Sequence, residues 1–214
     1  MGRLKILTIV PAYNEEKTIL KVIKSLEKHT DVLIIDDHSE DKTQKIVKKC
    51  KSLVIRNRKN LGYEKSIEKG IFAAMKLNYD YAITFDADGQ HHSSDIKKFL
   101  NLFKSGYDLV LGNRSLVTRS SEKIAKFLFF TKWSIKDPFC GFKGYKLKII
   151  KKYKFFERYK SVGVDLSLLL LNRGVKFKNV DIKTTKRKGK SKFGNKLIGN
   201  YKIFRSIILS FYYN

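Results

Sequence analysis

The chain has 214 residues, of which 43% are hydrophobic, and its 46 Lys and Arg outnumber its 20 Asp and Glu to give a net charge of +26. This length favours one folded domain with a substantial core. The charge suits nucleic acid, an anionic membrane or a phosphate-bearing substrate, and it is equally compatible with a lysine-rich composition that has no bearing on partners. The N-terminus has no apolar signal core, and no apolar run approaches the ~20 residues that span a bilayer, so we expect neither a secreted nor an integral membrane protein.

The two cysteines, Cys50 and Cys140, have neither the spacing of a metal site nor that of a redox motif. We therefore expect a reduced compartment and a packing role for both. None of the four histidines has zinc-ligand spacing, so a zinc enzyme is not indicated.

The first half of the chain alternates short apolar runs with segments of helical periodicity. Strands are expected at 4–10, 32–35, 53–56, 81–85 and 109–111, and helices at 15–28, 41–49, 63–77 and 94–104. This alternation predicts an α/β fold with a mainly parallel central sheet and helices on both faces. Ligands of such sheets bind beyond the carboxyl ends of the strands.

The second half of the chain is less regular and contains no internal repeat or Pro- or Ser-rich linker. We expect a basic, aromatic helix at 120–133, a turn-rich loop at 137–144, a buried helix end at 165–172, a strand at 175–182, a basic loop at 186–194 and a final aromatic helix at 197–213.

Polar clusters follow four of the expected strands, at residues 11–15, 36–39, 86–90 and 112–114. Because the carboxyl ends of parallel strands share one edge of the sheet, these clusters should lie near one another. Stability alone does not explain four such clusters, and we interpret this edge as the functional site.

Asp86 and Asp88 are two residues apart at the end of an expected strand, so both carboxylates can face the same way. Carboxylates at this spacing repel each other unless a cation lies between them, and a hard divalent ion suits their oxygens. Gln90 adds a neutral oxygen, and Gly89 allows a close turn. The alternative is a solvated turn that caps the next helix; the preceding strand and the neighbouring clusters favour a metal site.

Asp37 follows a buried strand, and its carboxylate is suited to accept hydrogen bonds from a base or a ribose hydroxyl. Tyr13 offers an aromatic face to a base, whereas Glu15 is equally explained as a favourable charge at a helix N-terminus. We interpret Ser39 and Asp41 as structural residues at the start of the next helix.

Six short motifs follow one another along the chain, at residues 10–16 (VPAYNEE), 35–41 (IDDHSED), 60–62 (NLG), 85–91 (FDADGQH), 137–143 (DPFCGFK) and 187–192 (RKGKSK). Together they resemble family 2 glycosyltransferases, and most closely the dolichyl- or polyprenyl-phosphate mannose and glucose synthases. Each motif alone is a modest signal, but six in order over nearly the whole chain are specific.

The resemblance implies a GT-A fold, with a Rossmann-like catalytic domain at 1–194 and a C-terminal amphipathic helix at 195–214. It also implies a GDP- or UDP-linked sugar donor whose diphosphate carries Mg²⁺ or Mn²⁺. The implied metal ligands are Asp86, Asp88 and Gln90, and the implied nucleotide-binding residues are Pro11, Tyr13, Glu15 and Asp37.

The acceptor that the resemblance implies is a polyprenyl phosphate, and the reaction is an inverting displacement. Because the acceptor oxygen is already anionic, catalysis would be mostly positioning and charge neutralisation, with Asp88 and Arg114 as catalytic residues. The implied phosphate- or acceptor-binding residues are Arg114, Arg119, Cys140, Arg187, Ser191 and Lys192.

Three positions depart from the family pattern: Asp165 stands where glutamate is common, Lys143 replaces a frequent arginine, and Glu64 replaces a usual glycine. Asp165 is also the residue that would act as a general base if the acceptor were a hydroxyl.

Residues 123–133 and 197–213 both mix basic residues with large apolar and aromatic ones, as interfacial helices do. The alternatives are ordinary packing on the core and, for the second segment, docking onto a membrane partner subunit. From these segments and the implied acceptor we expect a cytoplasmic protein, peripheral on the cytoplasmic face of the membrane.

Two other functions remain open from the sequence. One is a transferase of the same fold that acts on a glycan or protein hydroxyl. The other is a basic nucleic-acid-binding protein, which would show salt-sensitive binding and indifference to metal. That class leaves the strand-end carboxylates unexplained, and the chain has no recognisable nucleic-acid motif, so we expect no nucleic-acid partner.

Overall fold

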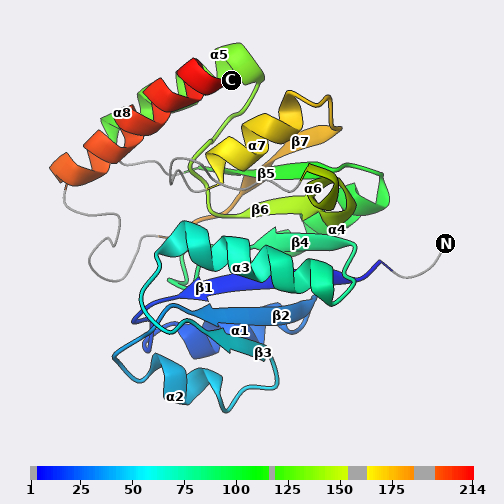
Figure 1. Ribbon diagram of the computed structural model, residues 1–214, viewed down its shortest axis with the longest axis vertical. Helices are drawn as coiled ribbons and strands as arrows, with labels where there is room; N and C mark the ends of the chain where they lie inside the picture. Colours follow the sequence, from blue (N-terminus) through cyan, green and yellow to red (C-terminus); the bar gives the residue numbers. More distant parts are fainter. Residues whose placement is uncertain (1–3, 116–118, 154–162, 186–195) are drawn as a thin grey trace.

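The computed structural model describes residues 4–115, 119–153, 163–185 and 196–214, and its centre is a seven-stranded sheet (Figure 1). The strands are β1 (Ile6–Ala12), β2 (Asp31–Asp36), β3 (Leu53–Arg56), β4 (Tyr81–Thr84), β5 (Leu109–Arg114), β6 (Lys143–Lys146) and β7 (Phe177–Ile182). The helices are α1 (Ile19–Leu26), α2 (Thr43–Val47), α3 (Tyr63–Lys76), α4 (Ile96–Lys104), α5 (Ser120–Trp133), α6 (Leu147–Tyr153), α7 (Val164–Leu171) and α8 (Lys196–Tyr213), and the 3₁₀ turn η1 (Ser93–Asp95) precedes α4.

The strands lie in the order β3-β2-β1-β4-β6-β5-β7. Strands β1, β2, β3 and β4 are parallel, as are β5 and β7, whereas β6 runs antiparallel between β4 and β5. Both halves of the sheet therefore point the same way, and the carboxyl ends of every strand but β6 meet at one edge. The mainly parallel α/β architecture expected from the sequence is confirmed.

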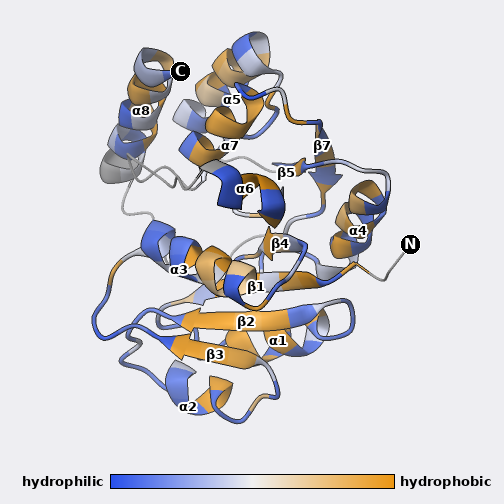
Figure 2. Ribbon diagram, turned by 45° about the vertical axis from the view of Figure 1, so that its right-hand side comes forward, coloured by the Kyte–Doolittle hydropathy of each residue, from blue (hydrophilic) through white to orange (hydrophobic). Residues whose placement is uncertain are grey.

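Helices cover both faces of the sheet and bury a separate apolar core on each. Helices α3, α5, α7 and α8 contribute to one core, which includes Ile71 and Phe129. Helices α1, α2 and α4 contribute to the other, which includes Ile23 and Phe99. Strands buried on both faces read as continuous apolar runs, and Figure 2 shows the sheet as mostly hydrophobic.

Strand β6 was not expected, because residues 143–146 are a short Lys-Gly-Tyr-Lys segment in a region that the sequence indicated to be a turn-rich loop. Gly144 explains why the strand fits: a Cβ at this position would collide with the rings of Phe103 and Phe99 in α4. Helix α6, which follows directly, was also missed. Tertiary packing rather than local pattern decides this region.

Helix α1 begins at Ile19 rather than at residue 15 as expected. Residues before it form a turn in which the Glu15 carbonyl accepts hydrogen bonds from the backbone N–H groups of Thr18 and Ile19. The backbone N–H of Glu15 in turn donates to Thr43 Oγ1 at 2.8 Å. The contact with the neighbouring loop thus replaces the first turn of the expected helix.

Helices α5 and α8 pack on each other at the far end of the molecule from α2 (Figure 1). They expose large apolar side chains: Ile124, Phe127 and Phe130 from α5, and Tyr201, Phe204, Ile208, Phe211, Tyr212 and Tyr213 from α8. Along both helices, hydrophobic and hydrophilic residues alternate (Figure 2). In the described parts of the chain, no helix is long and apolar enough to cross a membrane.

Candidate functional site

The loops that leave β1 and β2 are joined to each other at the carboxyl edge of the sheet. Asn14, which has a positive φ of 52°, accepts a hydrogen bond from the Glu40 backbone N–H at 2.8 Å, and its own N–H donates to Ser39 Oγ at 3.0 Å. Asp41 accepts hydrogen bonds from the N–H groups of Glu16 and Thr43. Ser39 and Asp41 are therefore structural, as the sequence suggested, and they hold two strand-end loops together.

Asp37 is buried and organises the next loop rather than pointing into open space. Its Oδ1 accepts hydrogen bonds from Asn57 Nδ2 at 2.7 Å and from the Leu61 N–H at 2.8 Å, and its Oδ2 accepts one from the Gly62 N–H at 2.8 Å. Lys69 Nζ donates to the carboxamide oxygen of Asn57 at 2.8 Å. The carboxylate thus shapes the 57–62 loop, and its predicted contact with a nucleoside stays a prediction.

The other predicted nucleotide-binding residues lie at the same edge. Pro11 is buried within β1, and Tyr13 and Glu15 are partly exposed just beyond its end. The Glu15 carboxylate accepts a hydrogen bond from Thr18 Oγ1 at 3.2 Å, which agrees with the alternative that this residue stabilises the start of α1.

The Asp86 carboxylate is held by two side chains that the sequence analysis did not single out. The Tyr63 hydroxyl donates to Asp86 Oδ1 at 2.8 Å, and His91 Nε2 lies 3.0 Å from Asp86 Oδ2. Burial raises the pKa of Asp86. The contacts with His91 and Tyr63 and the positive charge of Arg114 together lower it by more than burial raises it, so the pKa lies below the ordinary value. Burial and the Asp86 charge raise the pKa of Tyr63 well above its usual range, so Tyr63 is a permanent donor.

Asp88 and Gln90 lie on the exposed side of the same loop. Asp88 is partly exposed, and its Oδ1 accepts a hydrogen bond from the Gln90 N–H at 3.0 Å. Gln90 Nε2 donates to the Thr185 carbonyl at 3.3 Å, so the carboxamide oxygen is the end of this side chain that could bind a cation. The Thr185 N–H also donates to the Gln90 carbonyl at 2.9 Å, which joins this loop to the segment after β7.

The donor chemistry of this loop fits a hard divalent cation, because it offers two carboxylates and an amide oxygen. Within the described ranges, no group of three or more His, Cys, Asp and Glu is arranged to hold a metal ion. Mg²⁺ and Mn²⁺ at phosphate sites commonly take few ligands from the protein and the rest from water and the diphosphate. The predicted ligands Asp86, Asp88 and Gln90 are therefore compatible with a metal that binds together with a nucleotide.

Arg114, at the end of β5, forms a two-pronged ion pair with Asp137. Arg114 Nε lies 2.8 Å from Asp137 Oδ2 and Nη2 lies 3.0 Å from Oδ1, while Nη2 also reaches Glu122 at 2.9 Å. Burial raises the pKa of Asp137, but the guanidinium outweighs it and the pKa lies below the ordinary value. With two carboxylates around it, Arg114 is held rigidly, and its predicted contact with phosphate stays a prediction.

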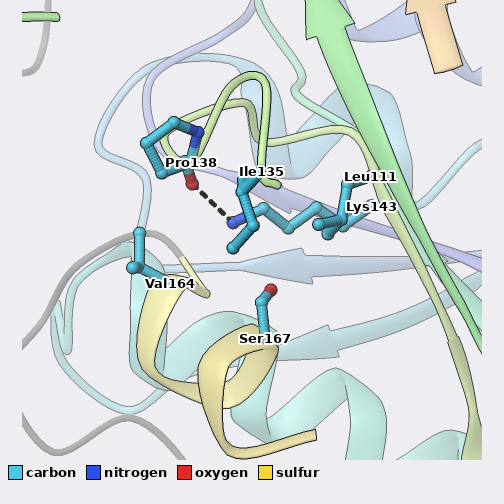
Figure 3. A pocket seen from close by; sticks show the side chains of 6 residues that line it. All are labelled: Leu111, Ile135, Pro138, Lys143, Val164 and Ser167. Carbon is cyan, nitrogen blue, oxygen red and sulfur yellow. Dashed lines mark hydrogen bonds between the residues drawn. The ribbon is translucent and has the colours of Figure 1, made fainter. Parts of the chain in front are cut away.

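Lys143 contacts the loop that contains Pro138, and Figure 3 shows its side-chain nitrogen pointing toward the Pro138 carbonyl. Its side chain is only 1% exposed, and Nζ donates to the Pro138 carbonyl at 2.8 Å. The surrounding pocket has no room for a water molecule and is lined by Leu111, Ile135, Pro138, Lys143, Val164 and Ser167. An ammonium group in so dry a place requires polar partners, so Lys143 fixes the 137–141 loop to the sheet.

Two predicted residues are placed where their side chains do not support the expected role. Cys140 is fully buried, and burial raises the pKa of its thiol to about 12, so it is a packing residue with no side-chain surface for an acceptor. Asp165 is also fully buried, in the first turn of α7. A carboxylate enclosed in this way is not placed to take a proton from a bound hydroxyl.

Of the remaining predicted phosphate ligands, the structure describes Arg119. Arg119 precedes α5, and its guanidinium packs over Gly199 of α8, where any Cβ would collide with it. The Ser121 hydroxyl of α5 lies 2.7 Å from Asn200 Oδ1 of α8, next to this contact. The predictions for Arg187, Ser191 and Lys192 fall on residues 186–195, outside the described residues.

Four residues that contact the predicted site residues were not singled out in the sequence analysis: Tyr63, His91, Asn57 and Asp137. His91 and Asp137 lay within quoted motifs, and their polar side chains next to Gln90 and Pro138 were an available signal. Nothing in the local sequence links Tyr63 or Asn57 to aspartates that are 23 and 20 positions away.

Comparison with known proteins places the chain in a family. The protein-family model described as "Glycosyl transferase family 2" matches residues 8–165. An uncharacterized protein of Methanocaldococcus jannaschii is 40% identical over 197 residues, which cover 79% of this chain and 83% of that protein.

Several relatives have names that describe an activity, and two of them match most of this chain. The UDP-N-acetylglucosamine–dolichyl-phosphate N-acetylglucosaminyltransferase of Methanococcus voltae is 27% identical, with 94% of each chain covered. A dolichyl-phosphate hexose transferase of Haloferax volcanii is 26% identical, with 94% of this chain and 91% of the relative covered.

Solved structures agree at the level of the fold. Glucosyl-3-phosphoglycerate synthase of Mycobacterium tuberculosis, determined with Mn²⁺, UDP and phosphoglyceric acid, aligns with a TM-score of 0.76 and 14% identity over 97% of this chain and 78% of that chain. The fold is thus that of the GT-A glycosyltransferases, and the chain belongs to glycosyltransferase family 2.

Proposed function

We propose that this protein is a metal-dependent, inverting transferase that moves a sugar, mannose or glucose, from a GDP- or UDP-linked donor to a polyprenyl phosphate. The observation that carries the proposal is the position of α5. This helix starts beside the carboxylate and guanidinium groups of the sheet edge, and it continues into an exposed aromatic surface shared with α8.

The contacts of α5 with the end of β5 support this arrangement. Lys126 Nζ donates to the Arg114 carbonyl at 2.9 Å and to Asn113 Oδ1 at 3.0 Å, and Glu122 pairs with Arg114. A lipid acceptor needs a polar site for its phosphate next to an apolar surface for its chain. The α5–α8 pair, which also carries Lys and Arg residues, offers an apolar surface for the chain beside the polar site for the phosphate.

The named relatives support the same acceptor class, because two of them are transferases to dolichyl phosphate. Their donors differ in the sugar, so the preference for mannose or glucose rests on the motif resemblance in the sequence. The solved relative with Mn²⁺ and UDP supports a divalent cation on the donor side.

In the proposed reaction, an anionic phosphate oxygen of the acceptor attacks the anomeric carbon of the donor sugar. The bond between that carbon and the β-phosphate oxygen breaks, and the nucleoside diphosphate leaves with the electron pair. A bound divalent ion offsets the charge that develops on the diphosphate. The protein orients the two anions, with Asp88 at the donor side and Arg114 and Arg119 at the phosphates.

A transferase that acts on a hydroxyl would need a general base. Asp165 is the candidate from the sequence, and its complete burial speaks against this alternative. The proposed acceptor needs no base, because its attacking oxygen carries no proton at neutral pH.

The test is thermal unfolding with GDP and UDP separately, each with and without Mn²⁺, on the wild type and on Asp88→Ala. A ligand that binds only the folded state raises the melting temperature by mass action. We expect one nucleotide to stabilise the wild type only when Mn²⁺ is present, and Asp88→Ala to lose this effect. No metal-dependent shift with either nucleotide would contradict the donor site.

A membrane assay tests the acceptor. Transfer of radiolabelled sugar to a polyprenyl phosphate in vesicles, but not to a soluble hydroxyl acceptor, is the expected outcome. Tight binding to polynucleotides without a nucleotide–Mn²⁺ effect would instead favour the basic nucleic-acid-binding alternative.

A further inference from the structure

Asp86 is enclosed on three sides by parts of the chain that are distant in sequence. Tyr63 reaches it from the first turn of α3, His91 from the loop before η1, and the backbone of Gly141 from the loop before β6. Gly141 must be a glycine here, because a Cβ would collide with both carboxylate oxygens of Asp86. The carboxylate therefore has one position, and two side-chain hydrogen bonds fix its rotation.

We propose that Tyr63 and His91 are positioning residues of the donor site, which hold the Asp86 carboxylate so that the 86–90 loop presents Asp88 to a nucleotide-bound divalent cation. The proposal rests on the proposed function. It adds two residues to the donor site, and in the role proposed for them neither contacts the nucleotide or the metal.

The contacts of the His91 side chain leave Asp86 as its hydrogen-bond partner among the described residues. Its side chain is 3% exposed, and its ring lies 5.6 Å, centre to centre, from both Phe85 and Phe142. Nδ1 is buried and has no hydrogen-bond partner among the described residues, so Asp86 is the only side chain there that fixes the ring by a hydrogen bond. Buried polar side chains are usually hydrogen-bonded, and the contact with Asp86 is the one that satisfies this buried imidazole.

The backbone on either side of His91 extends the effect to the rest of the loop. His91 forms an isolated antiparallel bridge with Thr184, and the neighbouring Gln90 exchanges hydrogen bonds with Thr185. Fixing Asp86 and His91 together thus fixes the loop between them, which contains Asp88 and Gln90. Residues that orient a ligand carboxylate without touching the metal typically change metal affinity by about 10–100-fold when they are replaced.

The experiment measures binding, not turnover. Isothermal titration with GDP or UDP, whichever stabilises the wild type, gives the nucleotide affinity with and without Mn²⁺. Electron paramagnetic resonance of free Mn²⁺ gives the metal affinity of the nucleotide-bound protein. The variants are Tyr63→Phe and His91→Leu, each of which removes one hydrogen bond to Asp86, because neither new side chain has a donor.

Matched controls exist elsewhere in the chain. Tyr79→Phe also deletes a hydroxyl that donates to an aspartate, Asp31 at 2.9 Å, but at the start of β2 and so at the opposite edge of the sheet. His29→Leu replaces a partly exposed histidine just before that strand. The melting temperature without ligand reports any loss of folding in each variant.

We expect Tyr63→Phe and His91→Leu to weaken Mn²⁺ binding about 10–100-fold, to leave metal-free nucleotide binding unchanged, and to fold as the two control variants do. Mn²⁺ affinities equal to those of Tyr79→Phe and His29→Leu would overturn the positioning role while the proposed function stands. A wild type that binds neither nucleotide in a metal-dependent way would overturn both. If one variant does not fold, the other decides.

Discussion

At the residue scale, Arg114 and Asp137 form a charged contact in which two nitrogens of the guanidinium meet one buried carboxylate. Replacing Asp137 by asparagine leaves the guanidinium with only Glu122 as a carboxylate partner. Removing one member of a buried ion pair typically costs about 3–5 kcal/mol. We therefore expect Asp137→Asn to lower the free energy of unfolding by about this amount in urea at pH 7. Glu68→Gln, in the exposed pair with Lys65, is the control and should cost at most about 1 kcal/mol.

The same pair predicts a pH dependence of stability. Because the pKa of Asp137 is lower in the folded state than its ordinary value of 3.8, its contribution is fully present above that value and is lost as the pH falls through the folded pKa. The difference in unfolding free energy between wild type and Asp137→Asn should therefore shrink below pH 3.8. A difference that stays constant down to pH 2 would contradict a charged Asp137.

Asp37 gives a second prediction at this scale. An asparagine there has one acceptor oxygen, whereas the carboxylate accepts three hydrogen bonds through two oxygens, from Asn57, Leu61 and Gly62. We expect Asp37→Asn to expose the amides of Leu61 and Gly62 to faster hydrogen exchange, and to cost about 1–3 kcal/mol through unsatisfied donors. Unchanged exchange at these two amides would show that the loop does not depend on the carboxylate.

At the scale of elements, α5 and α8 together expose large apolar side chains to solvent. Phe127 is 68% exposed and Ile208 is 67% exposed. Full burial of such a side chain is worth about 1.5–3 kcal/mol, and 1.4 kcal/mol corresponds to a factor of ten in binding. We expect the double variant Phe127→Ser, Ile208→Ser to bind anionic phospholipid vesicles at least about tenfold more weakly in a sedimentation assay.

The control for this prediction is Phe72→Ser. Phe72 is 48% exposed but belongs to α3, which packs on the other half of the sheet. Equal loss of vesicle binding in both variants would mean that general hydrophobicity, not the α5–α8 pair, drives adsorption. Loss of folding would be visible as a lower melting temperature of the double variant without vesicles.

Most elements with a regular pattern were predicted well, whereas β6 and α6, in the region decided by packing, were not. Strand β3 and helix α5 have the bounds expected from periodicity, and α3 differs by one residue. Strand β6 has no apolar alternation, and it exists because β4 and β5 leave a gap between them that a small residue, Gly144, can fill against Phe103. Local pattern contains no information about such a gap.

At the scale of the whole molecule, a net charge of +26 on 214 residues should destabilise the folded state through self-repulsion. Salt screens exposed charges over a Debye length that falls from about 30 Å at 0.01 M to about 3 Å at 1 M. We expect the melting temperature to rise with NaCl concentration, by about 2–4 °C for each kcal/mol of relieved repulsion in a domain of this size. A melting temperature that falls with salt would mean that local ion pairs outweigh the global repulsion.

The sequence by itself determined the fold class, the order of most elements and the position of the polar clusters. Periodicity and strand-end placement are local properties, and parallel topology then brings the carboxyl ends of β1, β2, β4 and β5 to one edge. Six ordered motifs likewise indicated the glycosyltransferase family before any contact was known.

Only the tertiary structure decided which polar residues hold one another and which are exposed. It paired Asp86 with Tyr63 and His91, and it paired Arg114 with Asp137. It also enclosed Asp165 completely. Hydrogen bonds between residues far apart in the chain depend on how helices and strands pack, and burial depends on everything that surrounds a side chain, so neither can be read from a residue's neighbours in sequence.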